Sequence, residues 1–165
     1  MGRATRGPDG VSDVDDRSHF VRTRVTADAR SAARTRAEFG SWLERHLTLG
    51  PERLSDLVLA VNEALANAAE FAYVDASQRG TVDVSAAYDD DSRTLAVTIY
   101  DRGRWRQRVP EPATVGPRPQ LRGRGIPLMR ALADEVTIDR TPRGTHVTLV
   151  WTDLTLNPPD AGAHA

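Results

Sequence analysis

Apolar residues recur along the chain at two spacings, every second residue and every third or fourth residue, and these spacings predict its secondary structure. Alternation at period two predicts strands over residues 19–25, 82–88, 95–99, 136–138 and 147–151. Helical spacing predicts helices over residues 27–47, 52–73 and 126–133. The first helix should be capped by Thr26 or Asp28, because either side chain can accept a hydrogen bond from a free N–H at a helix start.

The order of these elements predicts the fold class. The chain reads strand, helix, helix, strand, strand, long loop, helix, strand, strand. Short turns at residues 89–92 and 143–144 join neighbouring strands, which indicates a mixed, mainly antiparallel sheet. We therefore expect an α+β fold, a two-layer sandwich whose helices cover one face of the sheet. Phe39 and Trp42 of the first helix should lie in its core.

Polar composition at both ends sets the expected limits of the folded part. Residues 1–18 are expected to form a disordered leader, and residues 153–165 a loose C-terminal tail. Residues 19–152 are long enough to form one domain with its own core. No apolar run reaches the length of a membrane span, and the N-terminus lacks the apolar region of a secretory signal. We therefore expect a cytoplasmic location and no membrane partner.

Composition and charge exclude several kinds of chemistry. The chain has no cysteine, which excludes disulfides, cysteine-ligated zinc and thiol catalysis. All 22 basic residues are arginine, so Schiff-base chemistry and a Walker A lysine are excluded as well. Against 23 acidic residues they leave a formal net charge of -1, which gives no sign of direct binding to nucleic acid.

The segment from residue 101 to residue 124 differs in composition from the rest of the chain. It holds seven arginines and few aliphatic residues, with five prolines and glycines between Pro110 and Pro119. Such a segment is too long for an ordinary connection in so small a domain. The sequence therefore predicts a functional loop or a lid here.

Two polar residues of the second predicted helix are spaced for joint chemistry. Glu63 and Asn67 are four residues apart and therefore lie on one face of the helix, beside small or apolar neighbours. A carboxylate and an amide oxygen one turn apart suit the binding of magnesium and the orientation of a hydroxyl group. The alternative is an exposed Glu and Asn on a surface helix with no such role.

Two further signals involve glycine. An apolar strand leads directly into Asp101 and Gly103, which can place a carboxylate at a sheet end where glycine lets a ligand approach; a plain turn is the alternative. Gly123 and Gly125 precede the last helix, so backbone N–H groups at its positive end can receive a phosphate, unless the glycines form only a hinge. Thr145 opens the last strand, where its hydroxyl group can reach a bound base.

The joint order of these signals resembles a known family. The runs LVLAVNEALANAAEFAY, DRGRW, RGRGIPLMRALADEV and GTHVTLVW are similar to the motifs of the Bergerat-type ATP-binding domain shared by gyrase, histidine kinases, MutL and a heat-shock chaperone. Within that superfamily the chain most resembles the small anti-sigma-factor serine/threonine kinases of the RsbW and SpoIIAB type. The resemblance covers roughly residues 20–152.

The resemblance implies roles for the polar residues of the site. It implies that Asn67 binds Mg²⁺ and that Glu63 is the catalytic base or orienting group. It implies that Asp101 reads the amino group of adenine, that Gly103 gives room for the base, and that Thr145 lies near adenine. The cofactors implied are ATP and Mg²⁺.

The same resemblance implies a phosphate site, but the chain departs from the family pattern at two positions, Trp105 and Phe71, the second of which is histidine in many relatives. Gly123 and Gly125 would line the phosphates, and either Arg122 or Arg124 would touch the terminal phosphate. The usual second glycine of the Asp-x-Gly-x-Gly box is Trp105 in this chain, so that part of the pocket is bulkier or folds differently.

Three functions are consistent with these residues. The first is an ATP-dependent serine/threonine kinase that phosphorylates an anti-sigma-factor antagonist, a STAS-type protein, and sequesters a sigma factor. The second is an ATP-dependent protein-binding switch that transfers no phosphate, which Trp105 favours. The third, a two-component histidine kinase, is disfavoured because none of the four histidines lies in an H-box followed by a dimerisation helix pair. By analogy with the family, a homodimer is expected.

Overall fold

The computed structural model describes residues 13–71, 80–103 and 125–159 of the 165-residue chain. The helices in this part of the chain are α1 (Ala29–His46), α2 (Pro51–Phe71) and α3 (Gly125–Leu132). The strands are β1 (Val14–Asp15), β2 (His19–Thr26), β3 (Leu47–Thr48), β4 (Thr81–Asp89), β5 (Thr94–Asp101), β6 (Glu135–Thr141), β7 (Gly144–Trp151) and β8 (Thr155–Leu156). Every predicted helix and strand is present, with ends within three residues of the predicted ones. Most of the predicted lid, Trp105 included, lies outside the described residues.

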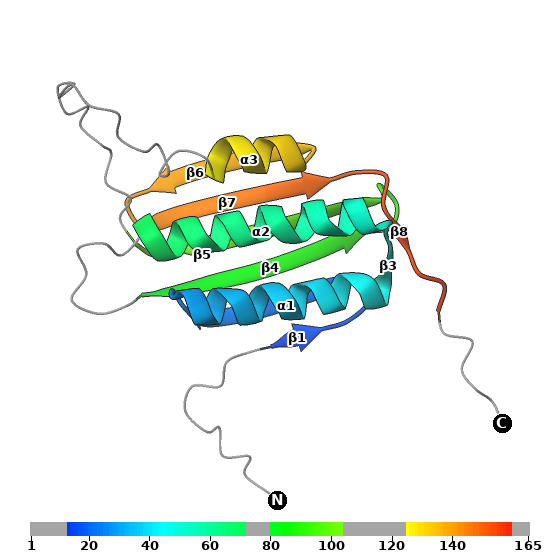
Figure 1. Cartoon of the computed structure of the whole chain (residues 1–165), viewed down its shortest axis with the longest axis horizontal. Helices are drawn as coiled ribbons and strands as arrows, with labels where there is room; N and C mark the ends of the chain where they lie inside the picture. The colour runs from blue at the N-terminus through cyan, green and yellow to red at the C-terminus, as the bar shows by residue number, and fades with distance from the viewer. Residues whose placement is uncertain (1–12, 72–79, 104–124, 160–165) are drawn as a thin grey trace, which may run out of the picture.

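The strands form a six-stranded sheet in the order β1-β2-β4-β5-β7-β6, and each pairing within the described residues is antiparallel. The three helices lie on the same face of this sheet (Figure 1). The predicted fold class, an α+β two-layer sandwich with helices on one face, is therefore confirmed. None of the helices in the described residues is both long enough and apolar enough to span a membrane.

The core lies between the sheet and the helices, and it follows from the alternation in the strands. In β5 and β7 every second side chain is buried, and these residues face the apolar side of α2, while α1 packs against β2. Phe39 and Trp42 of α1 are buried as predicted, and both pack against Phe20 of β2. Continuous apolar packing of this kind fixes the sheet register, because a slip by one residue would turn the buried face toward solvent.

Local hydrogen bonds set the start of α1. Asp28 precedes the helix in an extended conformation, and its Oδ1 accepts a hydrogen bond from the backbone N–H of Ser31 at 2.7 Å. Of the two predicted capping residues, Asp28 is therefore the cap and Thr26 ends β2 instead. From this start α1 runs along α2 over the same face of the sheet (Figure 1).

The fold extends into both the predicted leader and the predicted tail. Residues 14–15 form β1, which pairs with β2 and is held by an ion pair of 2.6 Å between Arg22 and Asp15. At the other end, β8 pairs with β3, Leu154 is buried, and the Asn157 amide donates to the last carbonyl groups of α1. Residues 13–18 and 153–157 are thus ordered parts of this domain, because tertiary contacts compensate for a polar composition.

Candidate functional site

Two buried polar residues end the core face of the sheet. Asp101 of β5 and Thr145 of β7 are paired in the sheet register, and they are only 1% and 2% exposed. Asp101 comes two residues after Ile99, and Thr145 comes two residues before Val147. Both therefore continue the same buried face of the sheet. Since buried carboxylates and hydroxyl groups are costly without polar partners, this end of the sheet is chemically distinct from the rest of the core.

The backbone around Asp101 is arranged tightly. Its Oδ1 accepts a hydrogen bond from the Gly103 N–H at 3.1 Å, and Gly103 itself is buried. Gly144 has a φ of 148°, and a Cβ atom on it would lie 1.9 Å from the backbone oxygen of Asp101. Only glycine fits at this position. The sequence identified residues 143–144 merely as a turn, since a long-range approach of this kind leaves no local pattern.

The predicted helix pair takes its position from α2. Asn67 is buried, with 9% of its surface exposed, and its side chain lies against the first residue of α3, Gly125. Glu63, one turn earlier, is half-buried and forms no hydrogen bond or ion pair within the described residues. The arrangement therefore differs from the alternative in which both residues point into solvent.

These residues lie at one end of the molecule. The C-terminal half of α2, the start of α3, the end of β5 and the start of β7 meet at the left of the view in Figure 1. The first turn of α3 carries no acidic residue, so its positive N-terminal end is not neutralised from within the helix. Two pairs of predicted site residues are thus in contact, Asp101 with Thr145 and Asn67 with Gly125. Gly103 donates to Asp101, and Glu63 lies one helical turn from Asn67 on α2. Arg122, Gly123 and Arg124 lie outside the described residues.

A metal site made by the protein alone is absent from this part of the chain. No three His, Cys, Asp or Glu side chains among the described residues cluster in a way that would hold a metal ion. Magnesium in nucleotide sites keeps water ligands and takes most other oxygens from phosphate groups, with one or two from the protein. A single oxygen ligand from Asn67 therefore fits a magnesium ion carried by a nucleotide, whereas it would not fit a structural metal.

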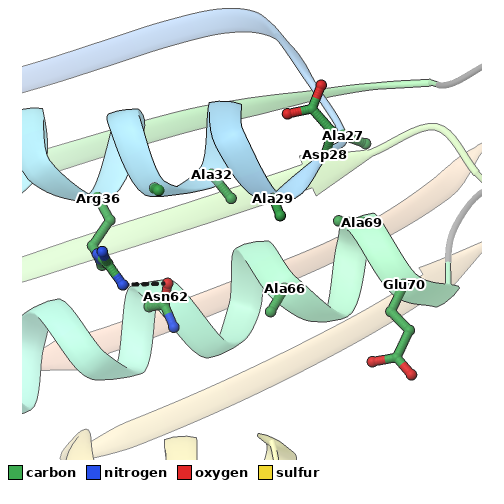
Figure 2. A pocket seen from close by; sticks show the side chains of 10 residues that line it. Ala27, Asp28, Ala29, Ala32, Arg36, Asn62, Ala66, Ala69 and Glu70 are labelled. Carbon is green, nitrogen blue, oxygen red and sulfur yellow. Dashed lines mark hydrogen bonds between the residues drawn. The ribbon is translucent and has the colours of Figure 1, made fainter.

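A separate groove of about 510 Å³ lies between α1 and α2. Figure 2 shows alanine side chains from both helices along it, with Arg36 donating to Asn62 across it at 3.2 Å. The lining residues are Ala27, Asp28, Ala29, Ala32, Ala33, Arg36, Asn62, Ala66, Ala69 and Glu70. None of the residues predicted to contact nucleotide lines this groove, because Asn67 points from the other side of α2 toward α3.

The family of the chain is shown by its match to known domains. Residues 25–151 match the family of histidine kinase-like ATPase domains, and the chain belongs to that family. The predicted resemblance to the superfamily of histidine-kinase-type ATPases is therefore confirmed, and an ATPase domain of this kind implies a site for ATP.

A solved structure shows the same fold. The crystal structure of the RsbU and RsbW domains of Rv1364c from Mycobacterium tuberculosis is similar, with a TM-score of 0.60 and 23% identity. That match covers 86% of this chain and 33% of the other, so the chain spans about a third of that protein. The histidine kinase domain of a blue-light activated kinase from Erythrobacter litoralis matches over 61% of this chain and 45% of its own, at 24% identity and a TM-score of 0.42.

Proposed function

We propose that this protein is an ATP-dependent serine/threonine protein kinase that phosphorylates an anti-sigma-factor antagonist and sequesters a sigma factor. The observation that carries the proposal is the meeting of two pairs at one end of the fold: Asp101 with Thr145, and Asn67 with Gly125. Membership of the ATPase family and the fold shared with an RsbW domain support it. In this proposal the protein acts in the cytoplasm.

Each pair has its own task in the proposed nucleotide site. Asp101 accepts a hydrogen bond from the exocyclic amine of adenine while it also accepts from Gly103, and Thr145 lies beside the base. Gly103 leaves room for the ring because it has no side chain. At the start of α3, Gly125 presents its backbone N–H group to the phosphates, and Gly123, which lies outside the described residues, would line them as the family resemblance implies.

Charge on the terminal phosphate is stabilised from two sides. Arg122 or Arg124 would contact it directly, since arginine forms charge-assisted hydrogen bonds with phosphate oxygens. Bound Mg²⁺ would neutralise charge on the phosphate oxygens, and Asn67 would be its protein ligand. The positive end of α3 adds to this field.

Glu63 is the proposed catalytic residue. Its carboxylate lies one helical turn from Asn67 and forms no ion pair among the described residues. In the proposed reaction Glu63 orients the hydroxyl group of a serine or threonine in the antagonist and accepts its proton, while the γ-phosphate passes to the hydroxyl oxygen and ADP leaves.

Protein partners would bind along α1 and the groove beside it. The proposed partners are a sigma factor, a STAS-type antagonist and a second copy of the chain. Arg30 and Arg34 are exposed on α1 and form no ion pair within the described residues. An acidic amphipathic helix of the sigma factor would suit this surface, with small apolar groups between Ala32 and Ala66 and carboxylates on the arginines.

The second function that the residues support is an ATP-dependent binding switch without phosphate transfer. Trp105, where the family pattern has a glycine, favours it, because a bulkier residue at this position would leave less room in the nucleotide pocket. The two functions share the ATP site, but only the kinase needs Glu63, for the transfer of phosphate.

Phosphate transfer with a Glu63→Gln variant separates these functions. The variant keeps the side-chain volume and removes the base, so transfer of labelled γ-phosphate to the cognate antagonist should fall about 10² to 10⁴-fold while ATP binding persists. Asn67→Ala should weaken Mg-ATP binding and every ATP-dependent activity together. Glu52→Gln, in the first turn of the same helix, is the matched control and should transfer phosphate normally. Transfer by Glu63→Gln at the wild-type rate would exclude the assigned role, and no transfer by wild type would establish the switch.

A further inference from the structure

The side chains next to Asp101 and Thr145 form an aromatic stack on the open face of the sheet. Strand residues alternate between faces, so Tyr100 and His146 lie opposite to the buried pair. They are directly paired in the register of β5 and β7, and their rings stack with centroids 4.2 Å apart and an interplanar angle of 19°. No helix among the described elements covers this face (Figure 1).

Tyr100 also contacts two residues that flank the proposed nucleotide site. The guanidinium group of Arg102 lies 5.0 Å from the centre of the Tyr100 ring and forms an ion pair of 2.8 Å with Asp83 of β4. The Tyr100 hydroxyl donates to the backbone oxygen of Arg143 at 3.4 Å. Arg102 separates Asp101 from Gly103, and Arg143 directly precedes Gly144. The Tyr100 side chain thus contacts Arg102, which neighbours Asp101 and Gly103, and Arg143, which neighbours Gly144.

The position of Tyr100 in its strand makes these contacts consequential. β5 ends at Asp101, and the last pairing between β5 and β7 is that of Asp101 with Thr145. Strand ends open more easily than strand centres, because fewer hydrogen bonds hold them. Any opening here would move the carboxylate and hydroxyl groups that face the proposed adenine site.

We propose that Tyr100 is a positioning residue for the nucleotide site: through His146 and Arg102 it clamps the ends of β5 and β7 from the open face. The proposal rests on the proposed function as far as it concerns ATP. The ring contacts, rather than the hydroxyl group, supply the clamp, because a hydrogen bond of 3.4 Å is near the upper limit for such a bond. Aromatic and cation–π contacts of this geometry are favourable beyond the area that they bury.

Amide hydrogen exchange in the nucleotide-free protein tests the clamp without reference to ATP. In Tyr100→Ala, the amides of residues 101–103 and 145 should exchange roughly five- to tenfold faster than in wild type. Tyr100→Phe should exchange as wild type does, which separates the ring from the hydroxyl group. Thr98→Ala is the matched control, since Thr98 occupies the preceding open-face position of β5 and contacts Thr148 instead. Equal exchange at residues 101–103 in Tyr100→Ala and Thr98→Ala would overturn the proposal.

ATP titration of the same variants then tests the link to the site. Tyr100→Ala should bind ATP roughly five- to tenfold more weakly, Tyr100→Phe and Thr98→Ala should bind as wild type, and His146→Ala should add little to Tyr100→Ala. If the alanine variant binds ATP normally, Tyr100 does not position the site. If wild type binds no ATP, the proposed function fails, whereas the exchange experiment still decides whether the clamp exists.

Discussion

The side chain of Asn67 lies so close to Gly125 that a methyl group on the glycine would be 2.8 Å from both its Oδ1 and its Nδ2. This contact links the proposed magnesium ligand on α2 to the first residue of α3, where the phosphates are proposed to bind. The atoms in the way belong to the end of a side chain, so Asn67 is able to move aside with little strain on the backbone. The absence of a side chain on Gly125 therefore determines where the Asn67 amide lies.

Gly125→Ala should impair binding without impairing stability. The methyl group would displace the Asn67 amide, and changes in groups that orient a metal ligand typically cost about 10- to 100-fold in metal affinity. Alanine suits a helix better than glycine, so the free energy of unfolding should stay the same or rise slightly. Titration of ATP at several magnesium concentrations measures the first effect and urea unfolding the second. The control is Gly40→Ala in α1, where a Cβ atom would meet Val58 Cγ2 at an ordinary 3.5 Å.

Gly144→Ala should behave in the opposite way and destabilise the protein itself. Its positive φ of 148° and the 1.9 Å approach to the Asp101 carbonyl oxygen involve backbone on both sides, so no side-chain movement relieves the clash. We expect the free energy of unfolding to fall by at least about 2 to 3 kcal/mol. Urea unfolding measures this loss, and a value within 0.5 kcal/mol of wild type, on the order of an ordinary surface substitution, would contradict the packing described here.

Gly125 and Gly144 also show which features of the structure can be predicted from the sequence and which cannot. The strands and helices were predictable because burial on one face imposes periods of two and about 3.6, as in β5 and α2. The presence of Asp101, Asn67 and Thr145 in the site was predicted from motif order, and the buried state of all three is consistent with it. Their contacts with residues far along the chain were not predictable, since no local pattern records a long-range approach.

The short strands were missed for a related reason. β1, β3 and β8 have two residues each, which is too short for any alternation to be visible. Tertiary contacts hold these short strands in place. Next to β8, for example, the Tyr88 hydroxyl group donates to the Leu154 oxygen at 2.7 Å. A polar terminal sequence with such anchors resembles a disordered tail in composition alone.

Asp134 should make stability depend on pH in the acid range. Burial tends to raise the pKa of its carboxyl group, but hydrogen bonds from the Thr152 backbone and from Arg53 outweigh burial and lower the pKa below its ordinary value of 3.8. A lowered pKa stabilises the folded protein fully above 3.8, and this contribution is lost as the pH falls through the folded-state pKa. Asp134→Asn should therefore cost about 0.5 to 1 kcal/mol at pH 7, since the carboxyl group is part-exposed.

Urea unfolding of wild type and Asp134→Asn at neutral pH and well below 3.8 measures this dependence. The difference between the two proteins should shrink at the lower pH, because both side chains are then neutral. A difference that stays constant over this range would show that Asp134 contributes through packing rather than through its charge.

Binding of ATP to an Asp101→Asn variant tests the central claim, that nucleotide binds where β5 ends and β7 begins. Asp101 would have to accept hydrogen bonds from both the Gly103 N–H and the adenine amine, whereas an amide of the same size offers only one oxygen. Loss of a charge-assisted hydrogen bond costs about 1.5 to 3 kcal/mol, so calorimetry should find Mg-ATP bound roughly 10- to 100-fold more weakly. The control is Asp89→Asn, which should bind ATP as wild type does. Asp89 is the last residue of β4, and the opposite end of that strand pairs with Asp101. A folded Asp101→Asn protein that binds ATP with wild-type affinity would contradict the account.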